Sequence, residues 1–341
     1  MEFANRSISV TSRKLLSMSI FNEQIARKPD LYSWTQDFSR SMHDGFWTHR
    51  EFNFQSDIQD FKVHLSEKER QMVIRALSTI GQLEIAVKKF WAKLGDNLPH
   101  PSIIDMGYVM ANTEVIHGDA YERLLEVLGI EDSFEEILKL DIISGRVNYL
   151  KKYLHKFHSD NKKQFVYSLI LFTLFIENIA LFSQFYVISW FGRFKNQLKD
   201  TNKQVEYTSR EEALHSLVGI KLVNVIRSEH PELFDDELEN KILHESEEAI
   251  KYELKIINWI LDGYDDEYLN SEILEQFIKS RMNDSLREIG YREIFDIDKT
   301  VLSKTVWFDE QVLGNNMTDF FNSRPVEYSK NSQSFNEEDL F

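Results

Sequence analysis

From Ser66 onward, the apolar residues of this 341-residue chain recur mostly at the spacing of a helix with one buried face. Only 12 glycines and 5 prolines interrupt the chain, so we expect long helices with few turns. The pattern predicts an all-α fold. The expected helices cover residues 31–45, 66–94, 101–129, 133–156 (one helix or a pair), 164–191, 202–229, 234–262 and 269–288.

Local capping signals define some of the expected helix ends. Ser66 and Glu69 have the spacing of a capping box, which satisfies the first free N–H groups of a helix. Pro101 suits the first position of the next helix, because its missing N–H has no partner there in any case. Gly129 suits the left-handed position just beyond a helix end.

The most apolar stretch, residues 164–191, is long enough to span a bilayer. However, Glu177 and Asn178 lie in its middle, and an unpaired carboxylate there is costly in lipid. A helix that is apolar on all sides is also what the centre of a large bundle requires. We therefore expect a buried core helix and no membrane span.

Composition excludes several classes of function. The formal charge of −16 argues against a nucleic-acid partner, since such binding depends on clustered Lys and Arg. The chain contains no cysteine, which excludes disulfides, thiolate metal sites and cysteine nucleophiles within it. Residues 1–19 lack a continuous apolar core of signal-peptide type, so a cytoplasmic protein is expected.

Two Glu-x-x-His pairs are the first candidates for chemistry. On a helix, Glu114 and His117 lie one turn apart on one face, and Tyr121 follows one turn later. Glu212 and His215 repeat the pair on another helix. One such pair is weak evidence because an acidic chain yields it by chance, but two pairs on separate apolar helices are stronger evidence.

Two further glutamates complete a repeated pattern. In each half of the bundle, a helix with a single glutamate precedes a helix with Glu-x-x-His, which is the ligand pattern of dinuclear metal sites in ferritin-like four-helix bundles. Four carboxylates balance two divalent cations, and this oxygen-rich set suits Fe or Mn better than Zn. The predicted ligands are Glu84, Glu114, His117, Glu177, Glu212 and His215.

The C-terminal end changes character. Residues 323–341 are polar and cannot form a core of their own, so we expect a flexible tail after a bundle domain of residues 1–322. The last two residues, Leu340 and Phe341, are apolar. They are either incidental or an anchor for a groove on a partner.

Over most of its length, the chain resembles the radical-generating small subunit of class I ribonucleotide reductase. The similarity lies in Glu114-x-x-His117-x-x-x-Tyr121, in Arg210-Glu-Glu-Ala-Leu-His215 and in residues 282–290 and 319–328. It implies a homodimer that works with a large catalytic subunit, on which the end of the tail docks. Because this chain has no cysteine, the cysteine chemistry of nucleotide reduction must belong to that partner.

The resemblance also implies a radical path. Trp47 matches the tryptophan beside the metal site, Tyr121 the radical tyrosine, and Tyr328 the tail tyrosine that relays the radical. Glu211 occupies a position where the family commonly has aspartate, between Trp47 and His117. From the residues alone, Trp47 would be a core tryptophan, Glu211 an exposed acid and Tyr328 an ordinary tail tyrosine.

Lys88 points to one subclass. It follows Glu84 by four residues, which on a helix is the spacing of an exposed salt bridge. A glutamate first ligand with such a lysine also resembles the dimanganese class Id, in which the oxidised metal pair itself holds the oxidising equivalent. Lys88 would then attract superoxide, and Tyr121 would not be the stable radical. Two iron ions, activated by oxygen, are the alternative.

Two other functions fit the same bundle. A ligand-binding metal oxidase would share the fold, but it would need no relay to Tyr328. A metal-storage or structural bundle would hold labile, redox-silent metal and would need no partner.

Overall fold

The computed structural model describes residues 19–154 and 161–312, and for residues 84–87, 147 and 149–154 it describes the backbone alone. The described part of the chain is helical, with one isolated bridge between Asp266 and Leu269 and no sheet. The predicted all-α fold is therefore confirmed.

Ten α-helices of seven residues or more make up most of the described chain. They are α2 (Trp34–Asp44), α4 (Glu67–Ala92), α6 (Pro101–Leu128), α7 (Glu131–Ile137), α8 (Asp141–Leu154), α9 (Lys162–Leu171), α10 (Phe182–Trp190), α11 (Lys199–Glu229), α12 (Asp236–Leu261) and α13 (Ser271–Glu288).

Shorter helical pieces connect them. The short α-helices are α3 (Gln55–Gln59), α5 (Leu94–Asn97) and α14 (Lys299–Leu302). The 3₁₀ turns are η1 (His49–Glu51), η5 (Pro231–Leu233) and η6 (Ser303–Thr305). The π-helices are η2 (Asp60–His64), η3 (Phe172–Ala180) and η4 (Phe191–Lys195).

The capping signals in the sequence act as expected. Ser66 Oγ accepts from the Glu69 N–H at 3.3 Å, and the Glu69 carboxylate accepts from the Ser66 N–H at 2.9 Å. Pro101 begins α6, and Gly129 ends it with a φ of 71°. These caps satisfy N–H and C=O groups that a helix end leaves free.

The long apolar segment differs from the single helix that we expected. It is divided into α9, η3, α10 and η4, with a break at Leu181 between η3 and α10. Lys162–Lys195 is apolar and long enough to cross a membrane, but 94% of its most apolar window is buried within the protein. This burial supports the predicted core position.

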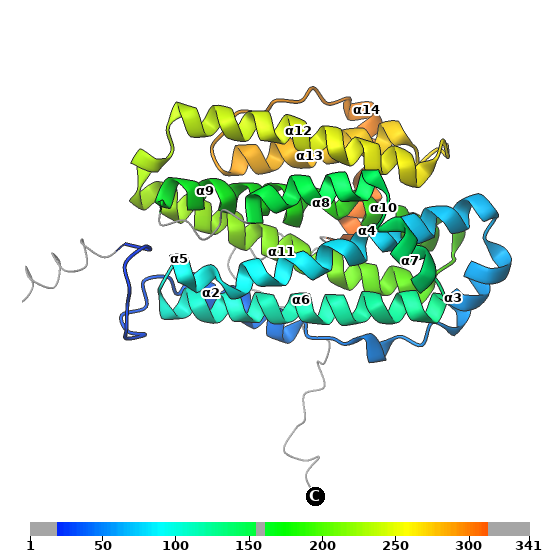
Figure 1. Ribbon diagram of the computed structural model, residues 1–341, viewed down its shortest axis with the longest axis horizontal. Coiled ribbons are helices and arrows are strands. Elements are labelled where there is room, and N and C mark those ends of the chain that lie inside the picture. Colours follow the sequence, from blue (N-terminus) through cyan, green and yellow to red (C-terminus); the bar gives the residue numbers. More distant parts are fainter. Residues whose placement is uncertain (1–18, 155–160, 313–341) are drawn as a thin grey trace, which may run out of the picture.

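The bundle is layered (Figure 1). Helices α12 and α13 lie on one side, α2 and α6 lie on the other, and α4, α9, α10 and α11 fill the middle. One continuous apolar cluster joins these layers. Among the four segments that carry predicted ligands, α4 packs on α6, α6 packs on α11, and α11 packs on η3.

A glycine allows two of these segments to approach closely. A Cβ atom on Gly219 of α11 would overlap the side chain of Thr173 on η3. Gly219 lies one turn after His215, so the close approach brings this metal-type ligand toward the segment that carries Glu177.

Candidate metal centre

The structure brings the predicted ligands together. Glu114 and His117 lie on α6, Glu212 and His215 lie on α11, and Glu177 lies on η3, all without exposed surface. Ligand atoms of Glu114, Glu177, Glu212 and His215 all lie within 4.8 Å of one another. The sixth predicted ligand, Glu84, is on α4, but its side chain lies outside the described residues.

Two carboxylates each reach both imidazoles. Glu114 places Oε1 2.8 Å from His215 Nδ1 and Oε2 3.4 Å from His117 Nδ1. Glu212 places Oε1 3.0 Å from His117 Nδ1 and Oε2 3.4 Å from His215 Nδ1. The two imidazole centroids are 6.2 Å apart. This is the arrangement of two bridging carboxylates between two metal positions, each with one histidine.

Glu177 belongs to the His215 side of this arrangement. Its Oε2 lies 3.5 Å from His215 Nδ1. In a symmetric site, the matching carboxylate on the His117 side would be Glu84.

The buried carboxylates and imidazoles shift one another's pKa values. Burial raises the pKa of Glu177 well above its usual value, and the charge of Glu212 raises it further. Burial also acts to raise the pKa of Glu212, but contacts with Glu177 and both imidazoles outweigh it and lower this pKa. For His215, the charge of Glu114 overcomes burial and raises the pKa well above its usual value.

The donor set fits two divalent cations. Both oxygens of Glu114 and of Glu212 are buried without a hydrogen bond of good geometry, which is costly unless another partner binds them. Carboxylate oxygens with one imidazole per position suit Mn or Fe. The residues present would therefore accept the metal pair that the sequence pattern predicts.

A hydrogen-bonded link leads outward from His117. Glu211 Oε2 accepts from Trp47 Nε1 at 2.8 Å and lies 2.8 Å from His117 Nε2. The rings of Trp47 and His117 are stacked, with centroids 6.1 Å apart. Glu211, although longer than aspartate, reaches both groups. It favours a proton on Nε2 and leaves Nδ1 to face the carboxylates.

Sequence reasoning did not assign a role to Trp91. Its Nε1 donates to Glu177 Oε1 at 2.9 Å, and its ring lies 5.9 Å from the ring of His215. Trp91 therefore fixes the oxygen of Glu177 that does not face His215. Its position two turns after Glu84 on the same face of α4 was the available signal.

The other predicted site residues lie at different distances from this cluster. Tyr121 is buried on α6, one turn after His117. Lys88 is half-buried, and its Nζ lies 3.7 Å from the position of a Cβ on Gly118, the residue after His117. Tyr328, Leu340 and Phe341 lie outside the described residues.

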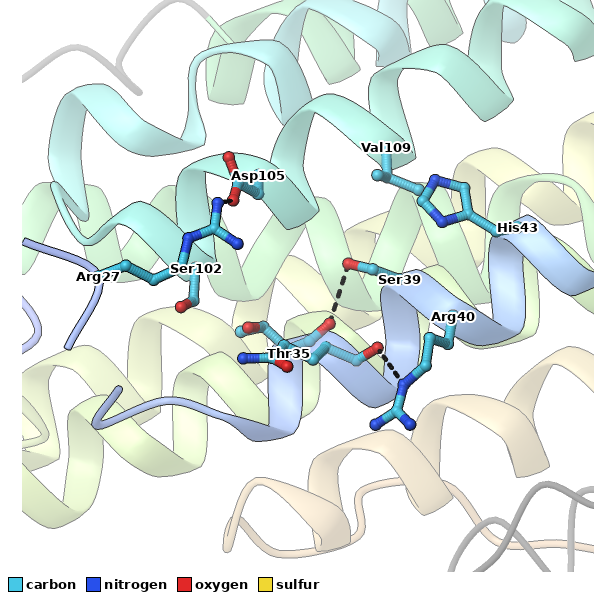
Figure 2. Close-up of a pocket in the computed structure, with 9 residues that line it drawn as sticks. Arg27, Thr35, Ser39, Arg40, His43, Ser102, Asp105 and Val109 are labelled. Atoms are coloured by element: carbon cyan, nitrogen blue, oxygen red, sulfur yellow. Dashed lines mark hydrogen bonds and ion pairs between the residues drawn. The ribbon is translucent and has the colours of Figure 1, made fainter. Parts of the chain in front are cut away.

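A surface pocket of about 290 Å³ lies elsewhere, between α2 and α6 (Figure 2). None of the predicted ligands lines it. Its two arginines are paired with acids: Arg27 with Asp105, and Arg40 with Asp37. The pocket therefore does not belong to the buried cluster.

The bundle and its paired carboxylates and imidazoles define a ferritin-like protein with a candidate dinuclear metal site. Residues 25–301 match the family described as ribonucleotide reductase, small chain. The chain belongs to this family, whose relatives are named as subunits of ribonucleoside-diphosphate reductase, an oxidoreductase.

Individual comparisons agree with this assignment. The chain is 23% identical over 323 residues to the ribonucleoside-diphosphate reductase subunit beta of Chlamydia pneumoniae, covering 88% of each chain. It matches the ribonucleotide reductase R2 subunit from Clostridium botulinum with a TM-score of 0.76 at 20% identity, covering 82% of this chain and 88% of that one. An R2-like ligand-binding oxidase gives a TM-score of 0.67 at 14% identity, covering 78% and 96%. The structural likenesses show a shared fold.

Replacing Trp91 tests the hydrogen bond that it donates to Glu177. Trp91→Phe should lower the free energy of unfolding of the metal-free protein by about 1–3 kcal/mol, because a buried carboxyl oxygen loses its donor. Denaturant titration measures this loss. Trp307→Phe is the matched control, since Trp307 Nε1 donates to Tyr186 Oη at 3.0 Å in a less buried place. Equal losses in the two variants would contradict the assigned contact.

Proposed function

We propose that this chain is the radical-generating small subunit of a ribonucleoside-diphosphate reductase. In this function it stores an oxidising equivalent and passes it to a cysteine of a large subunit, where ribonucleotides are reduced to deoxyribonucleotides. The observation that carries the proposal is the connection of two features: a cluster with two bridging carboxylates, and the Glu211 link from its His117 to Trp47.

The metal ligands in this proposal are Glu84, Glu114, His117, Glu177, Glu212 and His215. Two Mn or Fe ions bound there would supply a strong one-electron oxidant after reaction with superoxide or oxygen. The chain's own residues keep water away, because the described ligands are fully buried. The carboxylates and the Nδ1 atoms hold the ions, while Trp91 and Glu211 orient the ligands from outside.

Transfer outward uses the other side of His117. Trp47 would give an electron toward the metal ions, and its Nε1 proton already points at a carboxylate acceptor on Glu211. The oxidised Trp47 would then take an electron from Tyr328, and the oxidised Tyr328 would take one from the cysteine of the large subunit. Direct contact between Trp47, Glu211 and His117 favours this direction over a path through solvent.

We favour manganese over iron, with iron as the alternative. The support is Lys88, a half-buried residue whose ammonium group lies against α6 at Gly118, the residue after His117. A positive charge there would draw an anionic oxidant such as superoxide toward the cluster. In this scheme the metal pair keeps the oxidising equivalent, and Tyr121 is not the stable radical.

Assembly is also proposed. Residues 323–341 would form the tail that docks on the large subunit through Leu340 and Phe341, after a bundle domain of residues 1–322. Two chains would pair as a homodimer. Tyr108 and Val115, seven residues apart on the outer face of α6, are 60% and 42% exposed and offer an apolar surface for this contact. The protein would work in the cytoplasm without nucleic acid.

A ligand-binding oxidase is the second candidate, because such an oxidase shares the fold. It would not need a relay from Trp47 to Tyr328. A metal-storage bundle would release its metal readily and would be redox-silent.

Metal analysis with low-temperature EPR tests the centre. After expression with balanced Mn and Fe, and exposure to oxygen or superoxide, we expect about two Mn per chain, a coupled high-valent signal and no tyrosyl signal. A tyrosyl radical that disappears in Tyr121→Phe would instead support the iron alternative. Protein that holds no tight metal pair would overturn the proposed function.

Lys88 has a separate test. Lys88→Ala should slow activation by superoxide at least several-fold while both metal ions stay bound, because the variant loses a charge near the oxidant and no ligand. Stopped-flow formation of the oxidised centre measures the rate. Lys89→Ala, an exposed neighbour on α4, is the control. Unchanged activation in Lys88→Ala would remove its role.

Deletion of residues 323–341 tests the partner. The shortened chain should keep its metal content and its oxidised centre, but should lose nearly all nucleotide reduction when it is mixed with a large subunit. Pull-down by the large subunit and deoxynucleotide formation are the measurements. Full activity of the shortened chain would contradict tail docking.

A further inference from the structure

The helix that carries Glu177 breaks just after it. The π-helix η3 ends at Ala180 and α10 begins at Phe182. The N–H groups of Gln184 and Phe185 both donate to the Leu181 carbonyl, at 3.1 and 3.0 Å. In a continuous α-helix, the Gln184 N–H would donate to the Ala180 carbonyl. The buried Ala180 carbonyl therefore needs another donor.

Two arginines from other helices donate to carbonyls at this break. Arg146 on α8 donates from Nη2 to the Ala180 carbonyl. Arg281 on α13 donates from Nε to the Asn178 carbonyl at 3.0 Å and from Nη2 to the side-chain oxygen of Asn178. The amide nitrogen of Asn178 donates to Ser285 Oγ, also on α13. Both the backbone and the side chain of Asn178 are thus fixed to α13.

The arginines are costly groups to place here. Arg146 is 1% exposed and is paired with Glu253, with Nε 2.9 Å from Oε1. Arg281 lies 3.5 Å from the ring centre of Phe182, and its nearest acid, Asp309, is 4.0 Å away. Burial lowers the pKa of Arg281 to about 10. Burying a guanidinium group costs free energy. The hydrogen bonds at the helix break therefore explain the positions of these two arginines better than their charges do.

The geometry links this contact to the metal cluster. Asn178 follows Glu177 directly, and consecutive side chains on a helix point in different directions that are fixed relative to each other. Fixing Asn178 to α13 therefore sets the rotation of η3 about its axis. In that rotation Glu177 faces α11, with Oε2 3.5 Å from His215 Nδ1.

We propose that Arg281 and Arg146 are positioning residues for Glu177: they hold the helix break that turns its carboxylate toward the His215 side of the cluster. The proposal rests on the proposed function, because it treats Glu177 as a metal ligand. It goes further by assigning the orientation of one ligand to two arginines that touch neither metal ligand nor substrate in the described structure. The expected effect is asymmetric: it should fall on the metal position nearer His215, because Glu177 Oε2 faces His215 Nδ1 while Trp91 holds the other oxygen.

Arg281→Lys is the main variant, because lysine keeps the charge but cannot hold the carbonyl and the amide oxygen together. Metal-free protein is titrated with Mn²⁺ alone under anaerobic conditions by calorimetry, and EPR follows the coupling of the ions. The original chain should bind two Mn²⁺ as a coupled pair. The variant should bind one Mn²⁺ ion as the original chain does and the other at least about tenfold more weakly. The EPR spectrum should then show uncoupled Mn²⁺ when one equivalent has been added.

Arg75→Lys is the matched control. Arg75 also donates to a backbone carbonyl, that of Trp259 on α12, and its guanidinium lies 5.2 Å from the Trp259 ring centre. It should lose stability without losing the coupled pair. Circular dichroism checks that each variant is folded.

A second variant covers the case in which Arg281→Lys does not fold. Asn178→Ala removes the side-chain contacts to α13 and leaves the guanidinium on the carbonyl, so it should weaken one ion several-fold. If a folded Arg281→Lys or Asn178→Ala binds a coupled pair as tightly as the original chain does, the positioning role is overturned while the proposed function stands. An original chain that binds no pair overturns both.

Discussion

The burial of several carboxylates in one small volume is the constraint on which this structure depends. Glu114, Glu177 and Glu212 lie without exposed surface in an apolar bundle. Like charges at such distances repel one another, and each loses its hydration. Burial raises the pKa of Glu177, and the charge of Glu114 raises that of His215, so both groups hold a proton more tightly and the negative charge of the cluster is reduced. Divalent cations would do the same with coordination bonds in place of protons, which is why the cluster is most simply explained as a metal centre.

The surrounding bundle holds these groups from outside. Trp91 fixes one oxygen of Glu177, and Glu211 fixes the ring of His117. Gly219 lets α11 approach η3, and Arg281 with Arg146 holds the break that follows Glu177. Each contact joins segments far apart in the chain. The bundle therefore limits how the ligands can rotate, as a centre that must keep a reactive oxidant away from water requires.

The two sides of the cluster differ in what lies beyond them. On the His117 side, Glu211 and Trp47 form a polar link toward the surface layer that contains α2 and η1. On the His215 side, Trp91 and the phenylalanines packed on it form an apolar wall. In the proposed function, the first side would carry an electron and the second would exclude water. The difference also distinguishes the proposed radical function from metal storage, which needs neither the hydrogen-bonded link through Glu211 nor the apolar packing around Trp91.

The sequence by itself determined the helical class, most helix ends and five candidate ligands that the structure brings together. Helical spacing, the Ser66 and Gly129 caps and the two Glu-x-x-His pairs are local patterns, so they can be read along the chain. The π-helix at Glu177 and the pairing of η3 with Arg281 could not be predicted in this way. They depend on which helices pack together, because carbonyls at a helix break take whatever donor the neighbouring helix supplies. The same holds for Trp91 and Glu211: tertiary packing alone decided which buried polar groups meet, since each partner lies at least 86 residues away.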